Sequence, residues 1–186
     1  MANRLISLTC VLLTVAIVIS CKKAPEKATD PAPQASNDAQ QPDGRFHSHF
    51  GSTIACPADW KATDNGETWT LKSPDHNATI SIWTFPVQGS GTMQDFQNTM
   101  TNSITKEGTW KSSEWTSMDI GGTPGMKRTF DPQEGNPQLP CRAYLLQTGN
   151  FYSAILLRVS DEAMTSNGEF YEGLIRSFHG PTQGKS

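Results

Sequence analysis

A β-hairpin is predicted by residues 142–159, RAYLLQTGNFYSAILLRV. Two runs rich in apolar residues flank Gly149 and Asn150, a pair that favours a tight turn. Within the second run, residues 154–157 form the unbroken apolar sequence AILL, which indicates burial on both faces of a sheet. We therefore expect residues 151–159 to form a central strand.

Further strands surround this hairpin in the sequence. Alternation of polar and apolar residues or enrichment in strand-forming residues marks each of them. They are residues 46–56, 68–72, 78–82, 110–120 and 126–130. The segments 68–72 and 78–82 are separated by a turn sequence that begins with Ser73 and Pro74, so they should pair as a second hairpin.

Two helices are predicted by apolar residues at intervals of three and four. The first begins with a capping box of Thr92 and Asp95 and ends before Gly108. The second follows Ser166, with Glu169 at the matching position three residues later. Strands and helices together predict an α+β fold, with an antiparallel β-sheet of about six or seven strands flanked by helices.

The composition limits the classes of function. The chain has 186 residues, with 15 Lys and Arg against 18 Asp and Glu and a net charge of −3. This balance gives no reason to expect nucleic acid as a partner. Five Trp and eight Phe suffice for one core, so the length fits one domain with a tail rather than several domains.

The first residues resemble an export signal. Arg4 supplies a positive charge, and residues 5–19 form an uncharged stretch that is short for a bilayer span. Its end, VISC at residues 18–21, resembles the bacterial lipobox, which implies cleavage after Ser20 and acylation, with palmitate or a similar chain, at Cys21. The alternative is an ordinary secretory signal in which this cysteine is incidental.

The lipobox interpretation sets the expected organisation of the chain. Residues 1–20 would be the lipoprotein signal peptide and residues 21–45 a lipidated, disordered tether. A globular domain is expected at residues 46–180 and a flexible tail at 181–186. By resemblance to proteobacterial lipoproteins, Lys22 implies anchoring at the periplasmic face of the outer membrane rather than the inner membrane.

Two further cysteines follow the lipobox. Because an oxidising compartment favours pairing, we predict a disulfide between Cys56 and Cys141. The alternative is two separate buried thiols. A catalytic cysteine is disfavoured, since neither residue belongs to a Cys-x-x-Cys motif or has a neighbouring His to activate it.

Candidates for other chemistry are few. His47 and His49 alternate on one expected strand and would project to the same face, but no third metal ligand can be paired with them. A solvated strand face is the alternative. Pairing any Ser with His76 or His179 as a catalytic group would be arbitrary. We therefore predict no catalytic residues, no metal site and no cofactor.

Three tryptophans could in principle form an aromatic binding surface. One of them, Trp60, belongs to the motif IACPADW at residues 54–60. Trp110 and Trp115 are an odd number of residues apart, so on one regular strand they would point to opposite faces. A shared tryptophan platform is therefore disfavoured.

Several short motifs resemble a known fold family. They are IACPADW at residues 54–60, LKSPD at 71–75, GNFY at 149–152, and the closing segment from Phe170 to SF at 177–178. Together they resemble the PsbP-like fold of the photosystem II extrinsic protein and of DcrB-type bacterial lipoproteins. The resemblance implies an α/β/α sandwich used for binding and assembly rather than catalysis, with partners that differ among members. It also favours a core position for Trp60, which belongs to the first of these motifs.

The expected function combines these observations. We expect a non-enzymatic, lipid-anchored protein of the cell envelope that binds or stabilises another envelope protein through its PsbP-like domain. The alternative is a small-ligand or carbohydrate-binding module, or a periplasmic hydrolase, acting in a pocket that the sequence does not reveal.

Overall fold

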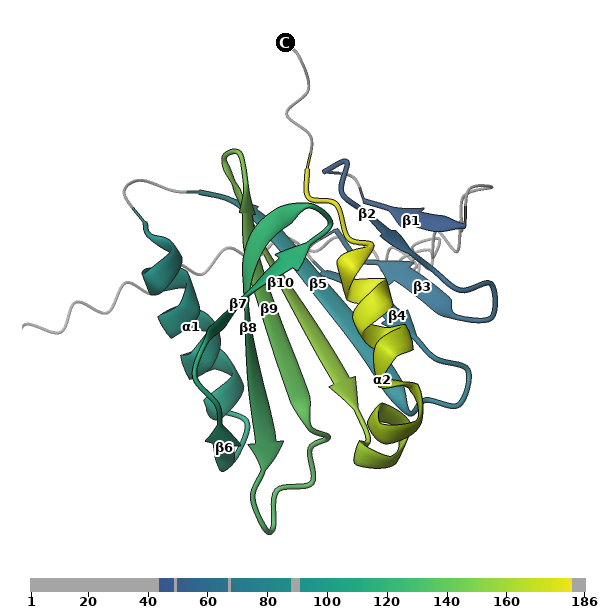
Figure 1. Ribbon diagram of the computed structural model, residues 1–186, viewed down its shortest axis with the longest axis vertical. Helices are drawn as coiled ribbons and strands as arrows, with labels where there is room; N and C mark the ends of the chain where they lie inside the picture. The colour runs from purple at the N-terminus through teal and green to yellow at the C-terminus, as the bar shows by residue number, and fades with distance from the viewer. Residues whose placement is uncertain (1–43, 49, 67, 88–90, 182–186) are drawn as a thin grey trace, which may run out of the picture. The chain divides into compact units, whose positions relative to one another are not determined.

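The computed structural model describes residues 44–48, 50–66, 68–87 and 91–181. The helices of this part are α1 (Met93–Thr105) and α2 (Asp161–Arg176), shown in Figure 1. Neither of these described helices has the length and apolar character that crossing a membrane requires. The strands are β1 (Arg45–His47), β2 (Thr53–Ala55), β3 (Lys61–Asp64), β4 (Thr68–Lys72), β5 (Ala78–Pro86), β6 (Trp110–Ser112), β7 (Thr116–Ile120), β8 (Thr123–Pro132), β9 (Cys141–Thr148) and β10 (Phe151–Val159).

The described strands form two antiparallel sheets. β1 and β2 pair with each other, and eight strands form a larger sheet in the order β3-β4-β5-β10-β9-β8-β6, with β7 also paired to β8. β10 lies at the middle and pairs along its length with β5 and β9. The central strand predicted at residues 151–159 is confirmed, as is the α+β class with an antiparallel sheet, although the sheet has eight strands.

Alternating side chains form separate cores on the two faces of the large sheet. One face, here the α2 face, packs against α2 and the β1–β2 hairpin. The opposite face, here the α1 face, packs against α1. The α2 face buries Trp69, Leu71, Ile80, Ile82, Ile155 and Leu157, and the α1 face buries Phe130, Ala143, Leu145, Ala154 and Leu156. The sheet therefore lies between the two helices, as the α/β/α prediction requires (Figure 1).

Helix α1 begins and ends where the sequence predicts. The Thr92 side chain accepts a hydrogen bond from the Asp95 backbone, and the Asp95 carboxylate accepts one from the Thr92 backbone. These reciprocal bonds satisfy amide groups that the first turn would leave unpaired. Gly108, with φ of 152°, follows the end of the helix. Phe96 and Ile104 bury the apolar stripe against the α1 face.

Helix α2 begins earlier than predicted. Its N-cap is Ser160, whose side chain accepts from the Ala163 amide, so the predicted start at Ser166 is wrong. The capping pattern of Ser166 and Glu169 coincides instead with a kink at Asn167, where φ is −133° and ψ is 23°. The pattern of Ser166 and Glu169 is typical of a helix start, but here it lies inside a helix that begins at Asp161.

The strand predicted at residues 46–56 is two strands. Ser48 turns the chain between β1 and β2, because its hydroxyl oxygen accepts hydrogen bonds from the amides of Phe50 and Ser52 at 3.0 and 3.2 Å. Gly51 completes the turn with φ of 79°, a conformation that favours glycine. The resulting hairpin forms its own small sheet beside the α2 face, a position that local alternation does not reveal.

The strand predicted at residues 110–120 is also divided. β6 and β7 both pair with β8, and residues 113–115 between them belong to neither strand. Ser113 bridges the gap, because its amide donates to the Thr129 carbonyl and its hydroxyl accepts from the Thr129 amide, each at 3.1 Å. β3 is an additional strand that the sequence pattern did not predict.

The end of the folded part extends slightly beyond the prediction. We expected the globular domain to end at residue 180 and a flexible tail to begin at 181. His179 exchanges backbone hydrogen bonds with Thr53 at 2.8 and 2.9 Å. Gly180 is buried, and a Cβ atom there would lie 2.2 Å from the Thr148 hydroxyl. The domain therefore includes residues up to Pro181, which is buried too. At the other end, β1 already begins at Arg45.

Candidate functional site

The α1 face of the sheet is covered over only part of its width. On β3, β4 and β5 the residues that point to this face are mainly Thr, Ser and Lys, and none of them is buried. The neighbouring residues on the same strands point to the α2 face and are buried, among them Leu71, Ile80 and Ile82. Helix α1 thus shields the strands near β10 and leaves the β3–β5 half of this face open.

An apolar groove lies where α1 meets this open half. It has a volume of about 540 Å³. From the sheet it is lined by Ser81, Trp83, Phe85, Leu156 and Arg158, and from α1 and the residues after it by Thr99, Met100, Ser103, Ile104 and Glu107. Phe85 is 37% exposed, and its ring meets Phe96 edge-on at 5.2 Å. A large aromatic side chain is therefore held in place at the edge of the groove with much of its surface in solvent.

One end of the groove is polar but electrically balanced. Arg158 on β10 forms an ion pair with Glu107 and donates a second hydrogen bond to the Gln138 side chain. Its charge is thus matched within the domain. The rest of the lining consists of hydroxyl and apolar groups, so the groove suits an uncharged, largely apolar ligand surface.

The outer surface of helix α1 beside the groove is polar but nearly uncharged. Asp95 is the single charged residue of the helix. Four of its hydroxyls donate to the carbonyl four residues earlier, at 2.8–2.9 Å: Thr99, Thr101, Ser103 and Thr105. Because these hydroxyls already have partners, covering them would cost less than covering hydroxyls that depend on water.

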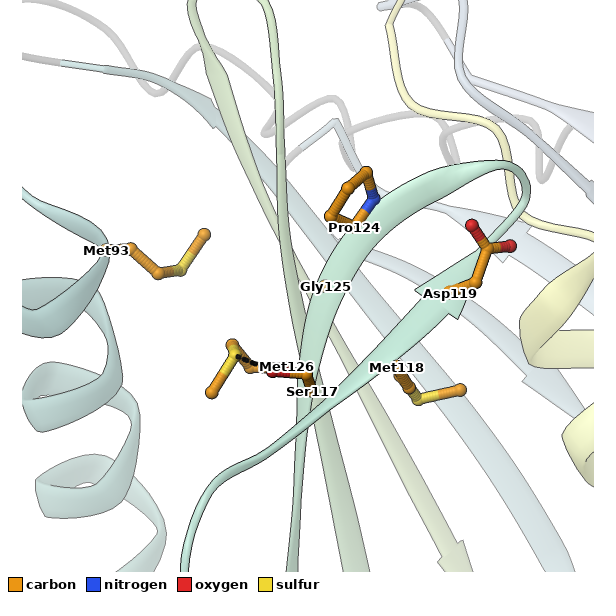
Figure 2. Close-up of a pocket in the computed structure, with 7 residues that line it drawn as sticks. All are labelled: Met93, Ser117, Met118, Asp119, Pro124, Gly125 and Met126. Carbon is orange, nitrogen blue, oxygen red and sulfur yellow. Dashed lines mark hydrogen bonds between the residues drawn. The ribbon is translucent and has the colours of Figure 1, made fainter.

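A second hollow lies on the opposite flank of α1, against the β7–β8 hairpin (Figure 2). It has a volume of about 460 Å³ and contains three methionines, Met93, Met118 and Met126. Met93 and Met126 pack with the α1-face core, whereas Met118 packs with the α2-face core, and Figure 2 draws its side chain on the other side of the hairpin. The three sulfur atoms therefore do not converge on one point. Flexible methionines of this kind adapt to varied apolar surfaces.

Gly125 lines this hollow at a position where β8 packs closely against its neighbours. A Cβ atom at Gly125 would lie 2.7 Å from the Ile120 side chain and 2.9 Å from the Leu145 carbonyl. The backbone of β8 can thus approach both neighbouring strands only because this residue has no side chain.

The predicted disulfide between Cys56 and Cys141 is wrong in this structure. Both residues are buried thiols. Cys56 belongs to the α2-face core and Cys141 to the α1-face core, so the sheet lies between them. The Cys56 thiol donates to the Pro57 carbonyl at 3.7 Å. Burial raises the pKa of both thiols, that of Cys141 to about 12. The alternative of two separate thiols describes the structure.

The other predicted site residues have separate locations. Cys21 and His49 lie outside the described residues. His47 is exposed at the end of β1, and His76 adopts φ of 59° in the turn before β5. Within the described ranges, no group of three or more His, Cys, Asp or Glu side chains could hold a metal ion. The absence of a cofactor and of catalytic residues stays a prediction.

The tryptophan predictions had mixed outcomes. Trp60 is 9% exposed and belongs to the α2-face core, as expected. Trp110 and Trp115 were expected on opposite faces, but both pack against the α1-face core. The break at residues 113–115 invalidates the odd-spacing argument, which holds only within one regular strand.

The residues of the groove itself were missed in the sequence. A signal was present, because the alternation that points Ile80 and Ile82 inward also points Trp83 and Phe85 to the other face. Two large aromatic residues on the face opposite a predicted core indicate either a second core or a binding surface. The structure shows a second core on this face, in which α1 covers Trp83 in part and leaves Phe85 37% exposed.

Comparison with solved structures identifies the architecture. The solution structure of cyanobacterial PsbP (CyanoP) from Synechocystis matches with a TM-score of 0.57 at 12% identity, covering 73% of this chain and 90% of that chain. The domain has the PsbP-like fold. No family profile and no curated protein sequence matches the chain, so the likeness is one of fold alone.

Two further solved structures share this fold. LpqN of Mycobacterium tuberculosis, described as involved in cell envelope biogenesis, matches with a TM-score of 0.51 at 8% identity, covering 72% of this chain and 87% of LpqN. PA94 of Pseudomonas aeruginosa, a protein of unknown function, matches with a TM-score of 0.51 at 13% identity, covering 75% of this chain and 97% of PA94. PsbP-like domains thus occur in proteins of different organisms and settings.

Proposed function

We propose that this chain is a lipid-anchored protein of the cell envelope whose PsbP-like domain binds another envelope protein without catalysing a reaction. The anchor would be Cys21, at the periplasmic face and in the outer membrane in preference to the inner membrane. Residues 22–45 would link the anchor to the domain. The lipobox-like end of the first segment and the envelope role stated for LpqN support this location.

The groove beside α1 carries the binding part of the proposal. It joins an exposed aromatic ring, an adaptable methionine and a balanced ion pair in one depression of about 540 Å³. Protein interfaces are depleted in charge and enriched in aromatic residues and Met at their centres. The low-charge outer surface of α1 continues this character beyond the groove.

Photo-crosslinking in cells tests the groove. A benzophenone amino acid in place of Phe85 should crosslink a discrete partner, because this side chain is exposed at the groove edge. The same amino acid at Glu134, an exposed loop residue, is the matched control. Adding Ser81→Lys should abolish the crosslink by placing a charge in the groove. Equal crosslinking from both positions, or none from Phe85, would reject the groove as the interface.

Metabolic labelling tests the anchor separately. The wild-type chain should incorporate a palmitate analogue and fractionate with membranes, and Cys21→Ser should lose both properties. Persistent label in the variant would show that Cys21 is not the acylated residue. Separation of inner from outer membranes then tests the expected outer-membrane location.

A further inference from the structure

A second depression lies on the α2 side of the domain, at the place where the PsbP-like sequence motifs meet. Three segments line it: Pro57, Asp59 and Trp60 after β2; Ser73, Pro74 and Asp75 after β4; and Asn167, Phe170 and Tyr171 at the kink of α2. Its volume is about 430 Å³. We call it the acidic aromatic pocket. It is separate from the groove, because it is built on elements that cover the opposite face of the sheet.

Three aromatic rings form the wall of the pocket. Trp60 lies 6.1 Å from the Phe170 ring and 6.2 Å from the Tyr171 ring, and the last two are 5.5 Å apart. Trp60 and Tyr171 are buried at 9% and 4% exposure, whereas Phe170 is 47% exposed. The exposed ring therefore rests on two that are fixed in the core. Nearly half of the Phe170 surface remains available to a ligand, although burying it would have stabilised the fold.

The charges of the pocket have one sign. Asp59 and Asp75 are both exposed, and no Lys, Arg or His is among the described residues that line the pocket. Asp59 forms no ion pair with any residue in the described part of the chain. Asp75 is held by hydrogen bonds from the Ser73 hydroxyl at 2.6 Å and the Asn77 amide at 3.1 Å, which lower its pKa. The adjacent hollow along residues 164–170 adds Glu169.

We propose that the acidic aromatic pocket binds a lysine or arginine side chain of a partner protein. A cation over the exposed Phe170 ring would gain from the ring and from both carboxylates at once. A zwitterionic headgroup such as phosphocholine has no net positive charge, and no cation in the described lining of the pocket would bind its phosphate. The observations thus favour a protein side chain over a membrane lipid.

Titrations of the full-length ¹⁵N-labelled chain in detergent with three probes test this assignment. The probes are acetyl-Gly-Arg-Gly-amide, its neutral citrulline analogue and phosphocholine, and the readout is backbone amide shifts. The arginine peptide should shift amides near Asp59, Asp75 and Phe170, weakly but saturably, and the citrulline peptide should not. Raising the salt concentration should weaken the effect.

Variants make the test specific. The double variant Asp59→Asn, Asp75→Asn should lower the affinity for the arginine peptide roughly threefold or more, and Phe170→Ala should lower it by a similar factor. Asp131→Asn, which removes an exposed carboxylate from β8, is the matched control and should leave the affinity unchanged. Unshifted amides elsewhere in each variant show that the fold is intact.

The proposal is overturned by any of three results. They are equal binding of the citrulline peptide, tighter binding of phosphocholine than of the arginine peptide, and shifts that persist in the Asp59, Asp75 double variant. Because the groove beside α1 is tested by crosslinking at Phe85, failure of one surface leaves the other unaffected.

Discussion

The two faces of the large sheet are built from the same strands but differ in what they leave exposed. The α2 face buries Trp69 to 1% exposure between the rings of Phe46 and Phe178. The α1 face holds two smaller cores, at whose edges Trp83, Trp110 and Met100 are only partly buried. The α2 face thus encloses one large core, whereas the α1 face leaves apolar surface exposed, and the groove proposed as a binding site lies there.

Removing one tryptophan from each face tests this difference most strongly. Trp69→Ala should reduce the free energy of unfolding by about 3–5 kcal/mol, because it empties a closed aromatic core. Trp83→Ala should cost roughly 1–2 kcal/mol, because part of this side chain is already in solvent. Urea unfolding measures both. Equal losses would show that the α1 face is as important for stability as the α2 face.

Acidic residues on the two faces provide a second comparison. Glu172 on α2 accepts from Lys127 at 2.5 Å, Tyr144 at 3.0 Å and Arg142 at 3.3 Å, and its side chain is 15% exposed. Glu107, at the groove, pairs with Arg158 and is 45% exposed. Glu172→Gln should therefore lower stability by about 1–3 kcal/mol at pH 7, and Glu107→Gln by less than about 1 kcal/mol.

The pH dependence of stability tests whether the negative charge of Glu172 causes the difference between the wild type and Glu172→Gln. Burial alone would raise the pKa of Glu172, but the hydrogen bonds and charges of Lys127, Tyr144 and Arg142 lower it overall. Because the pKa of Glu172 is lower in the folded than in the unfolded state, the ionised side chain stabilises the fold at pH values above the unfolded pKa, about 4.3. This stabilisation is lost as the pH falls through the folded pKa. The wild-type advantage over Glu172→Gln should thus shrink below about pH 4. An advantage of constant size would point to packing instead.

The sequence predicted elements whose signals are local. Residues 154–157 marked the central strand, and Thr92 with Asp95 marked the start of α1, because a buried run and a capping box each act within a few residues. The divided strand at residues 110–120 could not be predicted, since the break depends on how β8 pairs with both parts. The early start of α2 was missed because Ser160 gave a weaker pattern than Ser166.

The candidate sites depend even more on long-range structure. Alternation in the sequence gives the direction of Trp83 and Phe85, but not the extent to which α1 covers them. The acidic aromatic pocket joins Trp60, Asp75 and Phe170, which are far apart in the chain. Their motifs were recognisable, but that they form one pocket follows only from the fold.

The smallest expected effect concerns the cysteines, one in each core. Reduction should leave the melting temperature unchanged, because Cys56 and Cys141 are thiols on opposite faces of the sheet, whereas a disulfide needs Cα atoms within about 7 Å. Cys56→Ala and Cys141→Ala should each cost about 1 kcal/mol from lost packing. Without a bond between them, the two losses should add to within about 0.5 kcal/mol in the double variant. Two results would instead show that Cys56 and Cys141 form a disulfide: a double variant no less stable than either single variant, or a linked peptide in non-reducing mass spectrometry.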